Sequence, residues 1–163
     1  MSSLADILIA LEGLPSSQLI SSTILFPWIE SLHVLSIVLV VGTIAMVDLR
    51  LLGLRARERG ARSLIGEVLK YTWVAFGCAA LTGLLLFSSA ATIYAANPAF
   101  RIKAVLLALA GLNMAYFHLL PYRSIHLWDE LVSPPLKARI AGGVSLACWI
   151  GVVAAGRWVG FIQ

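Results

Sequence analysis

Four ionisable side chains interrupt a segment that is otherwise almost wholly apolar. The segment 30–55, ESLHVLSIVLVVGTIAMVDLRLLGLR, carries Glu30 and His33 near one end and Asp48 and Arg50 near the other. Such groups are costly in an apolar medium, at about 2.5 kcal/mol or more for Asp, Lys or Arg at the centre of a membrane helix, and they usually face the protein interior. They are therefore the first candidates for chemistry.

His33 and Lys103 lie at similar depths in two different apolar segments. His33 follows Pro27 by six residues, which is roughly 9 Å along a helix, and Lys103 follows Pro98 by five. An imidazole can ligate haem iron, and nearby cations can pair with the haem propionates. We therefore expect a haem b site with His33 as the axial ligand, and the candidate partners of the anionic groups are Arg101, Lys103 and Arg157.

Two other interpretations of this cluster stay open. The same cations could hold a different anion, such as a lipid phosphate. Alternatively, Glu30 pairs with Arg101 or Lys103 while His33 makes only a hydrogen bond between helices.

His118 is the second candidate ligand. One helical face contains the residues Lys103, Ala110, Met114 and His118. His118 lies 20 residues beyond Pro98, which is roughly 30 Å along a helix, so one iron cannot bind both His118 and His33. His118 is thus expected to be a second ligand at a separate site, or a residue that reaches the membrane interface beside Tyr122.

Asp48 and Arg50 lie where the first apolar segment ends. We expect Asp48 to pair with Arg50 or with another helix, and Arg50 to reach the interface. A proton-relay role for Asp48 is the alternative.

The composition identifies the kind of protein that must position these residues. The 163 residues are 60% hydrophobic and only 12% charged, and the mean hydropathy is +0.93. A soluble domain has about a quarter charged residues. We therefore expect an all-α integral membrane protein, a single transmembrane domain over residues 1–163. The net charge of +4 then reports membrane topology and not nucleic-acid binding.

Four segments are long enough to cross a bilayer, which takes about 20 mostly apolar residues. The expected spans are 28–54, 70–96, 99–120 and 137–160. Residues 3–12 carry a narrower apolar stripe and predict a short amphipathic helix at the interface. Asn97 is a suitable N-cap for the third span, with Pro98 at its first position.

The basic residues orient the bundle. Nine lie in or near the first and third connections, and three lie on the opposite side. The nine are Arg50, Arg55, Arg57, Arg59, Arg62, Lys70, Arg123, Lys137 and Arg139, and the three are Arg101, Lys103 and Arg157. The positive-inside rule then predicts a bacterial inner-membrane protein with both termini in the periplasm.

Small residues predict close helix contacts, within the bundle or in a homo-oligomer. Those in the second and fourth spans are Gly77, Gly83, Gly142, Gly143, Gly151, Gly156 and Gly160. The motifs GxGxxG, HExxH, GxSxG and CxxC are missing, so nucleophilic and nucleotide-dependent catalysis have no support.

Three stretches carry a resemblance to known proteins: FPWIESLHVLSIVLVVGTIAMVDLRLLGL, AANPAFRIKAVLLALAGLNMAYFH and AAGRWVGFI. Together they resemble an uncharacterised family of bacterial four-helix inner-membrane proteins. The parts WIESLHVLSIVLVVG and KAVLLALAGLNMAYFH are more distantly similar to HemJ-type protoporphyrinogen oxidases and CopD-like copper-resistance membrane proteins. The former similarity implies haem b at His33, Lys103 and His118, and the latter implies copper handling.

The sequence thus predicts a haem b-binding membrane protein that transfers electrons, with the lipid bilayer and a quinone or redox protein as partners. If it is an enzyme, it is a membrane oxidoreductase. One alternative is a copper-handling protein that uses His33, His118, Met46 and Met114. This chain has only three Met and two Cys, whereas Cu(I) prefers clusters of them. The other alternative is an accessory subunit without a cofactor.

Overall fold

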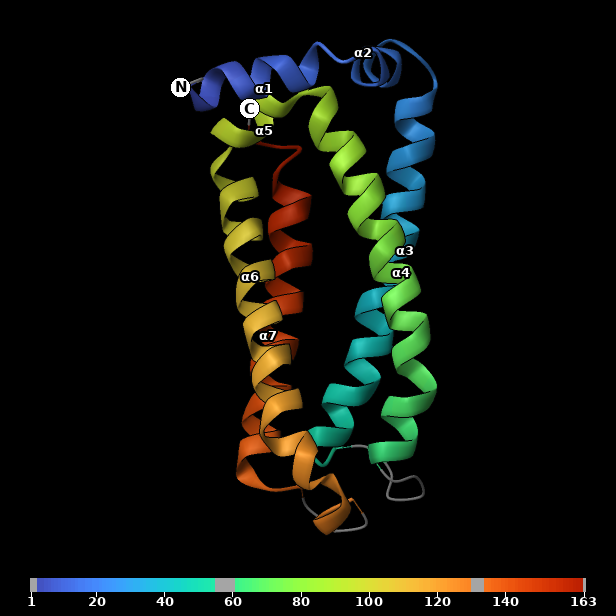
Figure 1. Ribbon diagram of the computed structural model, residues 1–163, viewed down its shortest axis with the longest axis vertical. Helices are drawn as coiled ribbons and strands as arrows, with labels where there is room; N and C mark the ends of the chain where they lie inside the picture. Colours follow the sequence, from blue (N-terminus) through green and yellow to red (C-terminus); the bar gives the residue numbers. More distant parts are fainter. Residues whose placement is uncertain (1–2, 55–60, 130–133, 163) are drawn as a thin grey trace.

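Four long helices form the body of the protein (Figure 1). The computed structural model describes residues 3–54, 61–129 and 134–162, and within these ranges the chain forms helices and no strand. The long helices are α3 (Leu25–Leu51), α4 (Ala61–Ser89), α6 (Pro98–Leu119) and α7 (Leu136–Trp158). All four are long and apolar enough to cross a membrane, so the expected multi-pass all-α bundle is confirmed.

Short helices cover the two ends of this bundle. Helices α1 (Leu4–Glu12), α2 (Pro15–Ser22) and α5 (Ala91–Ala96) lie at the end that also holds both termini, here called the terminus end. The 3-10 helix η1 (Pro121–Leu127) lies at the opposite end, here called the η1 end. The short N-terminal helix was predicted, whereas α2 and η1 were not.

The predicted start of α1 is confirmed by its cap. The Ser3 hydroxyl accepts a hydrogen bond from the backbone N–H of Asp6, and the Asp6 carboxylate accepts one from the backbone N–H of Ser3. This reciprocal pair satisfies two N–H groups that the first turn leaves free.

The second span differs most from its predicted bounds of 70–96. Helix α4 begins at Ala61 and ends at Ser89, and the backbone breaks at Ala90 (φ −154°, ψ 49°) before α5 starts. The first turns of α4 are polar, so apolar periodicity does not reveal them. At its other end the hydroxyls of Ser88 and Ser89 donate to carbonyls one turn back, which favours termination there. The predicted basic residues Arg55, Arg57 and Arg59 lie outside the described residues.

Asn97 caps α6 as predicted. Its side-chain oxygen accepts from the backbone N–H of Ala99 at 2.9 Å and of Phe100 at 3.3 Å, and Pro98 occupies the first turn. The Asn97 amide also donates to the carbonyl of Val159 at 3.2 Å. It therefore fixes the start of α6 to the end of the chain, an additional role that the sequence did not indicate.

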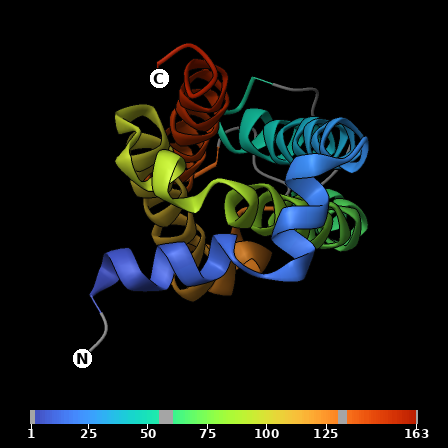
Figure 2. The same ribbon diagram turned by 90° about the horizontal axis from the view of Figure 1, so that it is seen from above.

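The bundle consists of two helix pairs with an open side. Helix α3 packs along α4, α6 packs along α7, and the pairs meet where α3 contacts α7. No Cα atom of α4 comes within 8 Å of one in α6, and both of these helices are described in full. Figures 1 and 2 show α4 and α6 diverging on the same side of the molecule.

The contact between α3 and α7 is close because one residue lacks a side chain. A Cβ atom placed on Gly142 would lie 3.0 Å from the Cβ of Leu51 and 3.1 Å from the carbonyl oxygen of Asp48. Gly142 thus lets the two backbones meet at the level of Asp48, as expected for small residues between membrane helices.

Candidate functional site

A cavity of about 680 Å³ lies between the four long helices, in the size range of small-molecule sites. Residues of α3, α4, α6 and α7 line it. Several lining side chains are nevertheless exposed: Trp73 is 51% exposed, Phe76 40% and Met114 41%. These three lie on α4 and α6, whose Cα atoms stay more than 8 Å apart, so the cavity opens sideways between these two helices.

Aromatic rings close the cavity at the terminus end. Phe87 of α4 stacks on Phe100 of α6, with ring centroids 5.3 Å apart, and Tyr94 of α5 lies 5.8 Å from Phe100. Burial and then the charge of Glu30 raise the pKa of the Tyr94 phenol. At the other end η1 contacts α4, α6 and α7. The unobstructed side of the cavity therefore faces lipid.

His33 projects into this cavity and one of its ring nitrogens is already committed. Its Nδ1 lies 2.9 Å from the hydroxyl oxygen of Thr82 on α4. The single hydroxyl proton of Thr82 has carbonyl acceptors at Cys78 (2.7 Å) and Ala79 (3.2 Å). When it is donated to one of them, the Thr82 oxygen accepts from Nδ1–H of His33, and Nε2 then carries a lone pair. The backbone of Ala79 is a further hydrogen-bond partner of the imidazole.

The imidazole is placed by close packing as well as by this hydrogen bond. A Cβ atom on Gly83 would lie 2.9 Å from Cε1 of His33, a distance that real Cβ atoms do not tolerate. Gly83 therefore makes room for the ring against α4. The hydrogen bond between helices that the alternative interpretation assigns to His33 is present, and the role of His33 as a ligand stays a prediction.

Lys103 lies in the lining of the same cavity, half-buried on α6. Its ammonium group acts electrostatically on the His33 ring, and its stem passes over Gly156 of α7, where a Cβ would lie 3.8 Å from Nζ. Among the described residues, Glu30 forms no ion pair with Lys103 or Arg101. Within the part of the chain that the structure describes, the cavity lining thus contains a cation without a fixed anion together with the imidazole of His33.

The other two predicted cations lie outside the cavity lining. Arg101 is exposed and donates from Nε to the carbonyl of Ala95 at 2.9 Å. Arg157 is also exposed, and its guanidinium lies 4.9 Å from the centre of the Phe161 ring. Of the three predicted partners of an anionic group, the structure therefore brings only Lys103 together with His33.

His118 lines the cavity near the η1 end. Its Nδ1 lies 2.9 Å from the carbonyl oxygen of Met114, which can only accept, so Nε2 is again free. The ring packs against Phe117 and Tyr122. Both α3 and α6 start at the terminus end, and His33 is roughly 12 Å along its helix whereas His118 is roughly 30 Å along its own. The two imidazoles therefore cannot share one iron.

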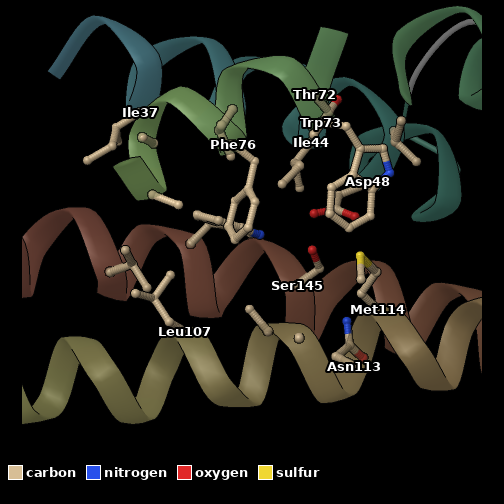
Figure 3. A pocket seen from close by; sticks show the side chains of 18 of the residues that line it. Ile37, Ile44, Asp48, Thr72, Trp73, Phe76, Leu107, Asn113, Met114 and Ser145 are labelled. Carbon is tan, nitrogen blue, oxygen red and sulfur yellow. The ribbon is translucent and has the colours of Figure 1, made fainter. Parts of the chain in front are cut away.

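Asp48 is buried, with 4% of its surface exposed, and does not pair with Arg50. Its carboxyl group points from α3 toward α7, where the Ser145 hydroxyl faces it (Figure 3). Arg50, also buried, donates to the carbonyl of Asp129 at 3.1 Å. Of the two expected pairings of Asp48, the one with another helix is found. The expectation that Arg50 reaches the membrane interface stays a prediction.

A comparison with protein-family models gives a match over residues 19–162, to a family described as "Family of unknown function (DUF6644)". The chain belongs to the DUF6644 family. Neither a curated protein nor a solved structure matches the chain. The predicted membership of an uncharacterised family is thus confirmed, and the more distant similarities to HemJ-type and CopD-like proteins stay predictions.

In this DUF6644 member, sequence reasoning missed three residues that shape the cavity. These are Thr82, Asn113 and Ser145. Single Thr, Ser and Asn residues are common in membrane helices, so their types alone give no signal. The pairing of the helices had to be known before Thr82 could be placed opposite His33.

The candidate copper ligands of the DUF6644 chain are dispersed. His33, Met114 and His118 line the cavity along its length, and Met46 is not among the lining residues. Within residues 3–54, 61–129 and 134–162, no three His, Cys, Asp or Glu side chains gather as a metal site. A haem needs only one such protein ligand, because its own ring nitrogens hold the iron.

Proposed function

We propose that this protein binds haem b in the lateral cavity and transfers electrons within the membrane. The observation that supports the proposal is the pair formed by His33 and Lys103. His33 offers an imidazole whose Nε2 can carry a lone pair, and Lys103 offers an ammonium group that forms no ion pair among the described residues; both side chains line the cavity. In a haem site such a nitrogen can ligate the iron and such a cation can pair with a propionate.

The residues of the chain fit such a group in three further ways. The cavity volume suits a ligand of this size. Aromatic side chains, among them Trp73, Phe87 and Phe100, supply flat apolar walls. Thr82 holds the Nδ1 proton of His33, and second partners of this kind fix the orientation of ligating histidines. When bound, haem supplies a one-electron redox centre.

His118 serves a separate role in this proposal, either as the ligand of a second site or as a structural residue. Its Nε2 makes no hydrogen bond among the described residues and could ligate the metal of a second site. Its position near the η1 end excludes binding to the same iron as His33. A mutant His118→Ala distinguishes the two roles, because only loss of a second site lowers the amount of haem per chain.

The membrane orientation belongs to the same proposal. Among the described residues most of the basic ones lie toward the η1 end, which supports a cytoplasmic η1 end and periplasmic termini under the positive-inside rule. A cysteine introduced at exposed Ser16 should then react with an impermeant maleimide in intact spheroplasts, and one introduced at exposed Ser63 should react only after lysis.

The test of haem binding is an absorption spectrum of the detergent-purified protein, oxidised and dithionite-reduced, with haem quantified per chain. We expect a b-type spectrum in the wild type and its loss in His33→Ala. The matched control is His126→Ala, since His126 is exposed and does not line the cavity. A colourless wild type, even after expression with added haem precursor, would overturn the proposal, and so would a His33→Ala variant with full haem content.

A further inference from the structure

The carboxyl group of Asp48 has an oxygen that the described part of the chain leaves without a partner. Oδ2 is buried and makes no hydrogen bond, although the side chain lines the cavity. Among the described residues, the Ser145 hydroxyl is the side chain that hydrogen-bonds to this carboxyl group. Buried polar groups in proteins are almost always hydrogen-bonded, and an unsatisfied one is costly. A ligand that places a polar group against Oδ2 would remove this cost.

The groups around Asp48 indicate what chemistry such a ligand has. Asn113 lines the cavity and uses one amide N–H on the carbonyl of Ala141, at 2.9 Å. Figure 3 shows this end of the cavity, with Asp48 and Ser145 between α3 and α7 and with Asn113 and Met114 on α6. Thr72 and His118 add two further polar side chains, and the remaining lining at this end is aromatic or aliphatic. The site therefore suits a neutral ring with one or two oxygen atoms.

The route into the cavity indicates the rest of the ligand. Rings close the terminus end and η1 covers the other, so a ligand passes between α4 and α6 from the bilayer. The side chains along this opening, including Trp73 and Phe76, are apolar or aromatic and half exposed. A long hydrocarbon tail could stay in the opening while the ring lies inside.

We propose that the η1 end of the cavity binds the head group of an isoprenoid quinone or its quinol, held by Asp48. A quinol hydroxyl donates to the carboxylate, and a protonated carboxyl group donates to a quinone carbonyl, so both forms satisfy the same oxygen. A phospholipid head fits poorly, because its phosphate would lie beside a carboxyl group. The assignment builds on the proposed electron-transfer function, since it names the redox partner, but the binding itself does not require haem.

The experiment measures binding of decylubiquinone to the purified full-length protein through quenching of tryptophan fluorescence, since Trp73 and Trp149 line the cavity. We expect saturable binding to the wild type. Loss of a hydrogen bond to a carboxyl group should weaken it about tenfold or more in Asp48→Leu. Asp48→Asn keeps a donor and an acceptor and should stay within a few-fold of the wild type. Ser36→Ala is the control, because Ser36 is buried on the same helix outside the cavity.

Two further measurements separate this proposal from the haem proposal and from misfolding. Circular dichroism and size-exclusion chromatography establish which variants are folded. If Asp48→Leu does not fold, Ser145→Ala replaces it as the test variant, with a smaller expected loss of binding. The haem content of each sample is read from its spectrum. If the purified protein contains no haem but binds decylubiquinone in a way that depends on Asp48, the quinone site is supported and only the haem proposal is contradicted. A wild-type protein, with or without haem, that does not bind decylubiquinone would overturn the quinone site. So would a wild-type protein that binds it no more tightly than the folded Asp48→Leu variant.

Discussion

Thr82 of α4 lies against the imidazole of His33 on α3, with 2.9 Å between its hydroxyl oxygen and Nδ1. The same hydroxyl group has the carbonyls of Cys78 and Ala79 as acceptors, at 2.7 and 3.2 Å. When its proton is donated to one of them, Nδ1 carries the imidazole proton and Nε2 keeps a lone pair for a ligand. Ligating histidines in proteins almost always have their second nitrogen held in this way.

Replacement of Thr82 by Val should therefore weaken haem binding while the helices stay paired. Loss of such a second partner typically costs about 10- to 100-fold in affinity. The measurement is haem retained per chain after dilution, with Thr82→Ser as the control, because the serine hydroxyl can make the same two bonds. Full retention in Thr82→Val would show that this hydrogen bond does not prepare His33 for a ligand.

Gly83→Ala tests the packing of the same ring. The new Cβ would lie 2.9 Å from Cε1 of His33, so the ring must rotate and leave Thr82. We expect a lower haem content with little change in stability. Gly77→Ala is the matched control on α4, since a Cβ there meets nothing within 4 Å. Equal haem contents in the two variants would contradict the proposed role of His33.

Much of the architecture follows from the sequence because it depends on local properties. The spans at α3, α6 and α7 agree with prediction to within three residues at each end, and Asn97 caps α6 as expected. Apolar length and capping chemistry are properties of adjacent residues. The polar first turns of α4 were missed because a helix can continue beyond the apolar segment that reveals it.

The site was harder to predict because it depends on contacts between helices. His33, Lys103 and His118 were recognised as ionisable groups in apolar segments, and all three line one cavity. Their partners could not be foreseen. Thr82 lies 49 residues from His33 in the sequence, and the close approach of Gly142 to Asp48 requires the crossing of α3 and α7 to be known.

That crossing yields a prediction for stability. A methyl group on Gly142 would meet the Cβ of Leu51 and the carbonyl oxygen of Asp48 at about 3 Å, and the backbone atom cannot move aside. Overpacking of this kind costs about 1–3 kcal/mol, so Gly142→Ala should lower the melting temperature in detergent. Its neighbour provides the control, because a Cβ on Gly143 meets only Leu52 at an ordinary 3.7 Å. Identical melting of the two variants would refute the close contact.

The attachment of α1 should depend on pH. The Glu12 carboxylate accepts from the backbone N–H and the hydroxyl of Thr92, both at 2.7 Å, and these bonds hold its pKa below the ordinary value of 4.5. Because the folded state favours the charged form, the contact is stabilised above pH 4.5 and is lost as pH falls through the lowered pKa. Hydrogen exchange at the α1 amides should accelerate, relative to intrinsic rates, over this range, and Glu12→Gln should remove the transition. A transition unchanged in Glu12→Gln would assign it to another group.

The cations near the terminus end provide the sharpest comparison, because composition alone treats Lys103 and Arg101 as equivalent. Only Lys103 lines the cavity with His33, whereas Arg101 is exposed and bonded to the carbonyl of Ala95. Lys103→Gln should therefore lower the amount of haem retained per chain, since a propionate loses its partner, and Arg101→Gln should leave it unchanged. Lys103→Arg should restore most of the retention, because the guanidinium keeps the charge. If Arg101→Gln instead caused the larger loss, the propionates would lie outside the cavity, and the assignment of the site would have to move with them.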